Sequence, residues 1–148
     1  MIAVIQRVKN ASVTIDNKLK SSIDKGLLIL LGVKNTDSQK DVLLLVNKIS
    51  KLRIFSDEND KMNLSVIDVC GEVLVVPNFT LLADYKKGNR PNYMYSAEPV
   101  LAKSLYELFS EEFSKIVPTK TGEFGADMKV NLLNDGPVTL VLDSEILK

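Results

Sequence analysis

The sequence predicts a single α+β domain, spanning residues 1–148, with a largely antiparallel, barrel-like β-sheet and two main helices. Three observations lead to this fold class. Apolar and polar residues alternate at both ends of the chain, as in half-buried strands. Two internal stretches instead repeat apolar residues at helical spacing, and no repeat or linker divides the chain. A chain of 148 residues is also long enough to bury a core without disulfide or metal staples.

The first quarter of the chain predicts three strands. Residues 2–8 and 13–15 alternate between apolar and polar types, which predicts two strands of a half-buried sheet. Asp16 and Asn17 then predict a turn. Residues 26–33 are apolar almost throughout, and this pattern is typical of a strand covered on both faces.

A first helix is predicted after residues 36–38, where Thr, Asp and Ser provide helix-start chemistry. Its buried stripe comprises Val42, Leu45, Val46, Ile49 and Leu52. Residues 53–55 resume extended structure, and the polar residues 56–63 indicate a solvated loop.

A β-branched strand over residues 72–76 is predicted to end at Pro77, because proline cannot donate to a strand ladder. The polar residues 84–93 indicate a long loop. Ser96 is expected to cap a second helix, with Pro99 in its first turn. The stripe of this helix comprises Leu101, Leu105, Leu108, Phe109 and Phe113.

Two further strand segments are predicted after Pro118. Residues 128–132 alternate up to the Gly136-Pro137 step, and residues 138–142 close the domain.

Residue counts exclude several kinds of protein. The chain has no histidine and a single cysteine, Cys70, so a Ser-His-Asp triad, an HExxH zinc site and an internal disulfide are all impossible. No cofactor or metal is predicted, and a reducing cytoplasm is the expected location. The nineteen basic and nineteen acidic residues cancel, which gives no general attraction to DNA or to an anionic membrane. The apolar run of residues 27–31 is too short to span a bilayer.

The strand end at residues 77–80, Pro-Asn-Phe-Thr, is the first candidate site. Pro77 stops the ladder, so the backbone N–H groups of Phe79 and Thr80 are candidates to hold a carbonyl oxygen as it gains charge. The structural alternative is a strand end packed by Phe79, with Thr80 bonded to a nearby carbonyl.

The second candidate is Gly136-Pro137 within the segment Asn-Asp-Gly-Pro-Val-Thr. One interpretation is a turn between two strands. The other rests on the low cost of a cis X-Pro bond, about 0.5–1 kcal/mol over trans, because a cis corner presents its carbonyls in a fixed direction. Such a corner could act as a wall.

Cationic residues provide two further candidates. Lys86, Lys87 and Arg90 lie within five positions of one loop, which indicates either a solvated loop or a patch that contacts phosphates. Arg7 is a charge in an otherwise apolar strand. Such residues usually lie at a sheet edge, but a guanidinium can also brace backbone carbonyls.

Several segments together resemble one known family. These are MIAVIQRVKNASVTID, GLLILLGV, LRIFSDENDKMNLSV, NFTLLAD, GNRP and TGEFGADMKVNLLNDGPVTLVLD. In order and spacing they resemble the bacterial D-aminoacyl-tRNA deacylases across essentially the whole chain. The most specific part is GADM followed at this distance by NDGPVT.

This resemblance implies an esterase that removes D-amino acids, and also glycine, wrongly attached to tRNA, and that acts as a cytoplasmic homodimer on the aminoacyl-tRNA acceptor end. It implies that Gly136 and Pro137 of one subunit enter the active site of the other and reject L-amino acids, with Arg7 bracing them. Backbone N–H groups of Phe79 and Thr80 would hold the substrate carbonyl, and Met128 of the GADM segment would contact substrate. Catalysis in this family is attributed to the terminal ribose 2′-OH of the tRNA.

The chain departs from the family pattern in one motif that matters, at two consecutive positions. The usual motif reads Ser-Gln-x-Thr, whereas Pro77 and Asn78 stand in the first two places here. This change leaves two alternatives to a strict D-aminoacyl-tRNA deacylase. One is an editing deacylase of relaxed chirality, and the other is a non-catalytic module that binds the acceptor end of tRNA.

Overall fold

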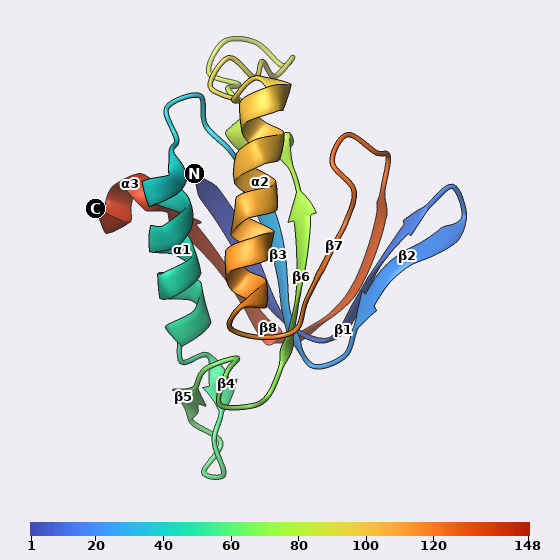
Figure 1. Cartoon of the computed structure of the whole chain (residues 1–148), viewed down its shortest axis with the longest axis vertical. Helices are drawn as coiled ribbons and strands as arrows, with labels where there is room; N and C mark the ends of the chain where they lie inside the picture. Colours follow the sequence, from blue (N-terminus) through green and yellow to red (C-terminus); the bar gives the residue numbers. More distant parts are fainter.

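The computed structural model describes all 148 residues as one α+β domain. Helices α1 (Gln39–Lys51) and α2 (Pro99–Ser114) lie side by side over one face of the sheet, and both chain ends lie near α1 (Figure 1). The other elements are β1 (Ile2–Ile15), β2 (Lys18–Ile23), β3 (Gly26–Gly32), β4 (Phe55–Ser56), β5 (Met62–Leu64), β6 (Glu72–Pro77), the 3₁₀ helix η1 (Phe79–Leu82), β7 (Thr119–Thr121), β8 (Lys129–Asp143) and α3 (Ser144–Leu147).

The main sheet is mixed rather than largely antiparallel. Its strands follow the order β2-β1-β3-β6-β7, and β8 pairs with the other edge of β1. Strand β1 is antiparallel to β2, β3 and β8, but β3–β6 and β6–β7 are parallel pairs. The parallel pairs arise because α1 and α2 each carry the chain back to the starting end of the sheet.

The sheet is nearly closed, as the barrel-like prediction required. Its two ends, β2 and β7, meet through side chains instead of a backbone ladder. The Ser21 hydroxyl donates to the Thr121 carbonyl at 2.6 Å, and the Lys120 ammonium donates to the Ser22 carbonyl at 2.5 Å.

The first 15 residues form one strand, not the two that were predicted. Strand β1 is continuous over 14 residues but changes partner along its length. Residues 2–8 pair with β3, whereas residues 11–15 pair with β2. The polar pair Lys9 and Asn10 at the change of partner interrupts the alternation and mimics a strand break.

The predicted segments 128–132 and 138–142 are the two halves of β8. Gln6 pairs with Thr139 and Val8 pairs with Asn134, so residues 135–138 stand opposite the single residue Arg7. The Gly-Pro step therefore lies in a wide bulge of a continuous strand rather than in a hairpin turn.

Both main helices were predicted, but one start was placed wrongly. Helix α1 begins after Ser38, whose N–H and hydroxyl both donate to the Asp41 carboxylate, at 2.9 and 3.0 Å. Helix α2 begins at Pro99 and its N-cap is Glu98, not Ser96. A residue before proline is confined to extended backbone, so the proline fixes the helix start.

The core has two parts because β3 contributes side chains to both faces of the sheet. Leu27 and Ile29 pack with α1 and α2 in the larger cluster, which includes Phe109 and Phe113. Leu28 belongs to a smaller cluster inside the curved sheet, with buried side chains from β1, β2 and β6. This arrangement confirms the prediction of a strand covered on both faces.

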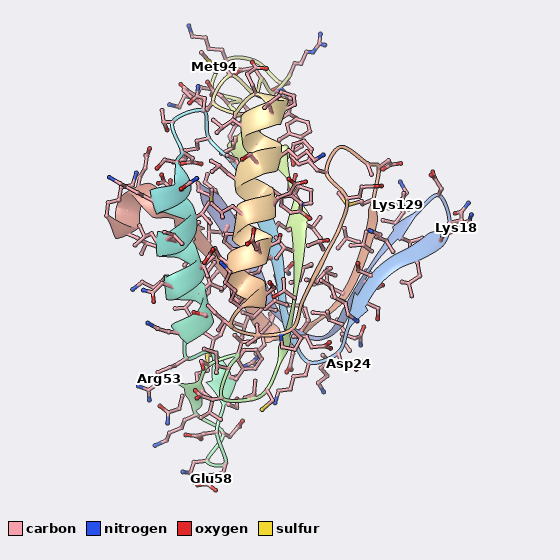
Figure 2. All side chains as sticks on the ribbon, viewed as in Figure 1. Lys18, Asp24, Arg53, Glu58, Met94 and Lys129 are labelled. Carbon is pink, nitrogen blue, oxygen red and sulfur yellow. The ribbon has the colours of Figure 1, made fainter.

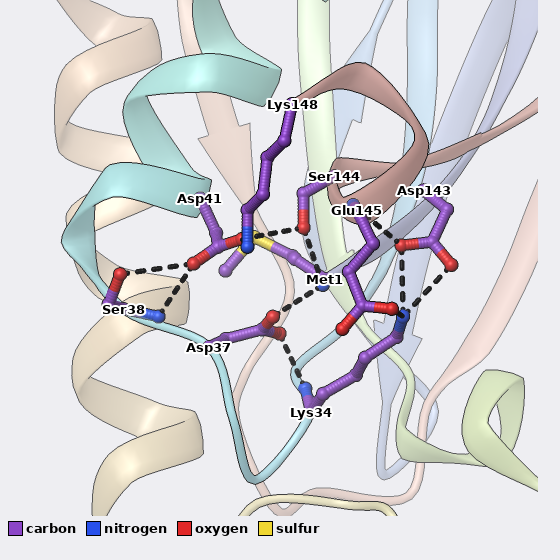
Figure 3. A network of polar contacts seen from close by, with 9 residues as sticks. All are labelled: Met1, Lys34, Asp37, Ser38, Asp41, Asp143, Ser144, Glu145 and Lys148. Carbon is purple, nitrogen blue, oxygen red and sulfur yellow. Dashed lines mark hydrogen bonds and ion pairs between the residues drawn. The ribbon is translucent and has the colours of Figure 1, made fainter.

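A buried polar network joins the two ends of the chain (Figure 3). The Met1 α-amino group, which is fully buried, donates to the Asp37 carboxylate at 2.5 Å and to the Ser144 hydroxyl at 2.8 Å. That hydroxyl donates to Asp41 Oδ1 at 2.8 Å, and the Lys148 ammonium lies 2.9 Å from the same oxygen. The network fastens α3 to the start of α1.

Acid should weaken this network at Asp41. Burial by itself would raise the pKa of the Asp41 carboxyl, but hydrogen bonds from Lys148 and Ser144 outweigh it and hold the pKa well below 3.8. A lowered folded-state pKa gives stability that is complete above the unfolded-state pKa and is lost as the pH falls through the folded-state pKa. We expect the wild type to have a higher Tm than Asp41→Asn. This difference in Tm should be largest at about pH 6 and should shrink below about pH 4. Thermal unfolding by circular dichroism checks this, and a gap that widens in acid contradicts it.

Candidate active site

A largely apolar pocket of about 840 Å³ opens beside the end of β6. Fourteen of its 22 lining residues are hydrophobic, and they come mainly from β3, β6, η1, α2, β8 and the segment before β8. The predicted site residues Pro77, Asn78, Phe79, Thr80 and Met128 all line it. The structure thus brings the four consecutive residues 77–80 and the distant Met128 to one cavity.

The strand end at residues 77–80 forms the polar rim of the pocket. The ladder ends when the Asn78 N–H donates to the Leu31 carbonyl at 2.8 Å, and the chain then turns into η1. The Phe79 N–H has no hydrogen-bond partner. The Thr80 N–H does have one, because Asn78 Oδ1 accepts from it at 3.2 Å. Of the two N–H groups predicted to be free, only that of Phe79 is free.

The Phe79 ring marks the mouth of the pocket. It is 59% exposed and meets the ring of Tyr93 edge-on, with centroids 4.8 Å apart. The alternative interpretation, a strand end packed by Phe79 with Thr80 bonded to a nearby carbonyl, does not hold, because the ring is largely exposed and the Thr80 hydroxyl donates to the Asn78 side chain. An exposed aromatic pair of this kind provides a surface on which a planar ligand group can stack.

Only two lining residues carry titratable side chains, and neither is placed as a general base. Burial raises the pKa of Tyr106 to about 12, and its hydroxyl donates to the Val75 carbonyl at 3.2 Å. Asp127 has a carboxylate that is 88% exposed and lies 3.1 Å from the Lys129 ammonium. The pocket can therefore bind and polarise a carbonyl group, but its side chains offer no base to activate a hydroxyl such as that of Thr80.

Met128 is fixed against the loop that precedes β8. Its sulfur accepts a weak hydrogen bond from the Glu123 N–H at 3.4 Å. Gly122 makes room for it, since a Cβ built on that glycine would lie 2.6 Å from the Met128 sulfur. Sequence reasoning did not select this glycine, although the Met128 sulfur lies against it.

The Gly136-Pro137 corner is exposed and does not line this pocket. The peptide bond between the two residues is cis. Arg7, which is 9% exposed, donates from Nε to the Asp135 carbonyl at 3.0 Å and from a terminal nitrogen to the Ile54 carbonyl at 2.7 Å. Arg7 therefore contacts the base of the corner and ties it to the chain after α1.

Sequence reasoning missed two polar residues near this corner. The Asn134 amide donates to the carbonyls of Arg7 and Val138, both at 3.0 Å, and so closes the base of the bulge. Gln6 lines the pocket and donates to the Thr139 hydroxyl at 3.4 Å. Asn134 had a usable signal, because asparagine beside a Gly-containing turn commonly bonds to nearby backbone.

The basic loop candidates do not join the pocket. Lys86, Lys87 and Arg90 are exposed, form no ion pair and lie in the segment between η1 and α2. Figure 2 shows Met94, near the end of this segment, at the opposite end of the molecule from Glu58. The loop approaches the pocket through the Phe79–Tyr93 contact.

The structure lacks two further kinds of feature. No group of three or more His, Cys, Asp or Glu side chains is arranged to hold a metal ion. No helix combines the length and apolar character needed to cross a membrane.

Comparisons with known proteins give a consistent result. Residues 4–143 match the family described as D-Tyr-tRNA(Tyr) deacylase. The D-aminoacyl-tRNA deacylase of Sulfurihydrogenibium sp. (strain YO3AOP1) is 57% identical over 147 residues, which cover 99% of this chain and 100% of the relative. The D-aminoacyl-tRNA deacylase of Parabacteroides distasonis is 54% identical over 147 residues, which cover 98% of this chain and 98% of the relative.

Two solved structures share the fold. One, described as c-Myc DNA Unwinding Element Binding Protein, has a TM-score of 0.92 and 41% sequence identity over 97% of this chain and 98% of its own. The other, described as a probable eukaryotic D-amino acid tRNA deacylase, has a TM-score of 0.81 at 15% identity, over 95% and 97% of the two chains, and shows the fold alone. The fold and the relatives define a hydrolase of the deacylase class. The chain belongs to the D-Tyr-tRNA(Tyr) deacylase family.

Proposed function

We propose that this protein hydrolyses the ester bond of D-aminoacyl-tRNA and releases the free D-amino acid and tRNA. Glycine wrongly attached to the tRNA for alanine is proposed as a second substrate, and the cytoplasm as the location. The observation that carries the proposal is an apolar pocket with an unbonded Phe79 N–H at its rim in a chain of this family. Such an amide suits a carbonyl oxygen that gains negative charge during ester hydrolysis.

The active form is proposed to be a homodimer in which each subunit inserts Gly136 and Pro137 into the pocket of the other. Three features of β8 support this arrangement. The corner is exposed and absent from its own pocket. Leu133 and Val141 on the same strand are 52% and 71% exposed, which is unusual for large aliphatic side chains. A two-fold dimer would bury both surfaces by one self-complementary contact.

The inserted corner is proposed to reject L-amino acids by steric clash, while a D side chain points away into open space. A fitted hydrophobic pocket discriminates by only about 1–3 kcal/mol per methylene-sized difference. A rigid backbone wall excludes one enantiomer of every amino acid, whatever its side chain is. Strict chirality and a broad substrate range then have a single cause.

The catalytic base is proposed to come from the substrate. The chain has no histidine, and the two titratable residues of the pocket are unsuited to the role. The 2′-OH of the terminal ribose lies next to the ester in any aminoacyl-tRNA and would assist the attack of water, while the protein supplies position and carbonyl stabilisation. Lys86, Lys87 and Arg90 would contact the phosphates of the acceptor end.

The test is a deacylation assay on matched tRNAs that carry D-Tyr, L-Tyr or glycine. We expect turnover of the D-Tyr and glycyl esters and an intact L-Tyr ester. No cleavage of a D-aminoacyl ester at stoichiometric enzyme would refute the proposal, and acceptor-end binding without cleavage would indicate a binding module. Equal rates on L-Ala and D-Ala esters would indicate an editing enzyme of relaxed chirality.

Gly136→Ala tests the wall. Gly136 has φ +132°, a backbone conformation that L side chains rarely adopt, and an added Cβ would lie 3.0 Å from both an Arg7 nitrogen and a Val138 methyl, so the substitution strains the corner. Rates at a site are sensitive to misplacement, falling by about 10²-fold for a shift of about 1 Å, so we expect a strained corner to lower the D-Tyr to L-Tyr rate ratio by about 10-fold or more. Gly88→Ala is the matched control. Gly88 also has positive φ, +74°, but nothing lies within 4 Å of its added Cβ. An unchanged ratio in Gly136→Ala would argue against the wall.

A further inference from the structure

We propose that the side-chain amide of Asn78 is the second donor to the substrate carbonyl, beside the Phe79 N–H, and that Thr80 is a positioning residue that holds this amide. The inference rests on the proposed deacylase function. It assigns a catalytic role to a side chain at the position where this chain departs from the usual Ser-Gln-x-Thr motif.

The hydrogen bonds of Asn78 fix which end of its amide is which. The Thr80 N–H lies 3.2 Å from one terminal atom and can only donate, so that atom must be the oxygen. The Thr80 hydroxyl donates to the same oxygen. The nitrogen must then point the other way, and both of its N–H groups are without a partner in the structure.

The same bonds remove the Thr80 N–H from the list of free donors. A substrate carbonyl could reach it only after Asn78 Oδ1 had left both the N–H and the hydroxyl of Thr80. The Asn78 Nδ2 group is already free and belongs to a residue that lines the pocket next to Phe79. Asparagine amides act as such donors in other hydrolases.

The short side chain of Asn78 explains why Thr80 can hold the amide in one orientation. An asparagine oxygen commonly accepts from the backbone N–H two residues further on, as it does here with Thr80. Glutamine, with one more methylene, forms this bond less readily. Asn78 therefore presents a fixed amide where a glutamine would present a mobile one.

The donors from Asn78 and Phe79 should stabilise the transition state more than the bound substrate. Water adds to the ester carbon and gives up one proton through the neighbouring ribose 2′-OH, while the carbonyl electron pair moves onto the oxygen, which becomes negative. When the intermediate collapses, the carbonyl re-forms, the bond to the ribose 3′-oxygen breaks, and that oxygen takes up the proton that the water gave up. Donors from Asn78 and Phe79 bond more strongly to the negative oxygen than to the neutral one, so their loss lowers kcat more than it raises KM.

Asn78→Ala separates this model from one in which the Thr80 N–H is the donor, because the models predict opposite results. If Asn78 is the donor, kcat on D-Tyr-tRNA falls by about 10²–10³-fold with KM little changed. If the Thr80 N–H is the donor, removal of the Asn78 side chain exposes it, and kcat is kept or rises. Asn78→Asp keeps the acceptor toward Thr80 but aims a negative oxygen at the carbonyl, so its loss should be at least as deep. Retained kcat in either variant would overturn the inference.

Substitutions at Thr80 test the positioning role. Thr80→Val removes the hydroxyl but keeps the backbone N–H, so we expect a smaller fall in kcat, about 10-fold, that Thr80→Ser largely restores. Equal rates for the two variants would contradict positioning by the hydroxyl. The wild-type assay separates this inference from the proposed function. An inactive wild type defeats the proposed function, whereas an active wild type with an equally active Asn78→Ala defeats only the inference.

Discussion

Phe79→Pro is expected to lower kcat on D-Tyr-tRNA by about 10²–10³-fold relative to Phe79→Ala. Both substitutions remove the ring that meets Tyr93, but only proline removes the backbone N–H. That N–H is the unbonded donor at the rim of the pocket, so the difference between the two variants measures its contribution to catalysis.

The local backbone should accept this proline. Phe79 is the first residue of η1, where an N–H has no partner within the helix. The preceding residue, Asn78, has φ −147° and ψ 91°, close to the extended region that a following proline requires. Single-turnover kinetics give kcat, and thermal unfolding confirms that both variants fold. Equal rates in the two variants would remove the Phe79 N–H from the mechanism.

The same variant shows which subunit provides the wall. Gly136→Ala subunits are mixed with an excess of Phe79→Pro subunits, so that most intact pockets face a partner with an intact corner. If the corner acts across the dimer, the D-Tyr to L-Tyr rate ratio returns toward the wild-type value. If each corner serves its own pocket, the ratio stays low. Light scattering of the purified protein establishes whether it is a dimer at the assay concentration.

Much of the fold could be predicted from periodicity. Helix α1 and strands β3 and β6 have regular patterns and flanking start or stop residues, and they lie where the sequence placed them. The parallel pairing was missed although a signal was present. Two apolar strands separated by a helix favour a parallel crossover, and β3, α1 and β6 follow that order. Strand β7 could not be predicted, because three residues carry no periodicity and the strand exists only through its pairing with β6.

Sequence reasoning named five of the residues that line the pocket, but it did not predict their contacts. The Phe79 N–H is free, as predicted, but the Asn78 N–H still joins the ladder after Pro77, so the proline alone does not account for the free donor. The fate of the Thr80 N–H depends on the rotamer of Asn78, which no sequence pattern specifies. Likewise, the Met128 sulfur occupies space that is open because Gly122, six positions away, has no side chain.

The largest expected effect on stability concerns the α-amino group of Met1. This ammonium group is fully buried, and its partners are the Asp37 carboxylate, itself 2% exposed, and the Ser144 hydroxyl. A Gly-Ser extension before Met1 replaces the ammonium with a neutral amide and forces added chain into a closed space. Loss of one partner from a buried ion pair costs about 3–5 kcal/mol, because the remaining charge is left unpaired. We therefore expect the free energy of unfolding, measured with urea, to fall by about that amount.

A matched extension and a second substitution identify the cause of this loss. Gly-Ser added after Lys148 leaves the Met1–Asp37 pair in place and should change stability little. Asp37→Asn should destabilise the unextended protein, because the Met1 ammonium then loses its counter-charge. In the N-terminally extended protein the same substitution removes an unpaired buried carboxylate, so it should cost less or restore stability. An identical cost of Asp37→Asn in both backgrounds would show that the extension acts through steric crowding rather than through the buried charge.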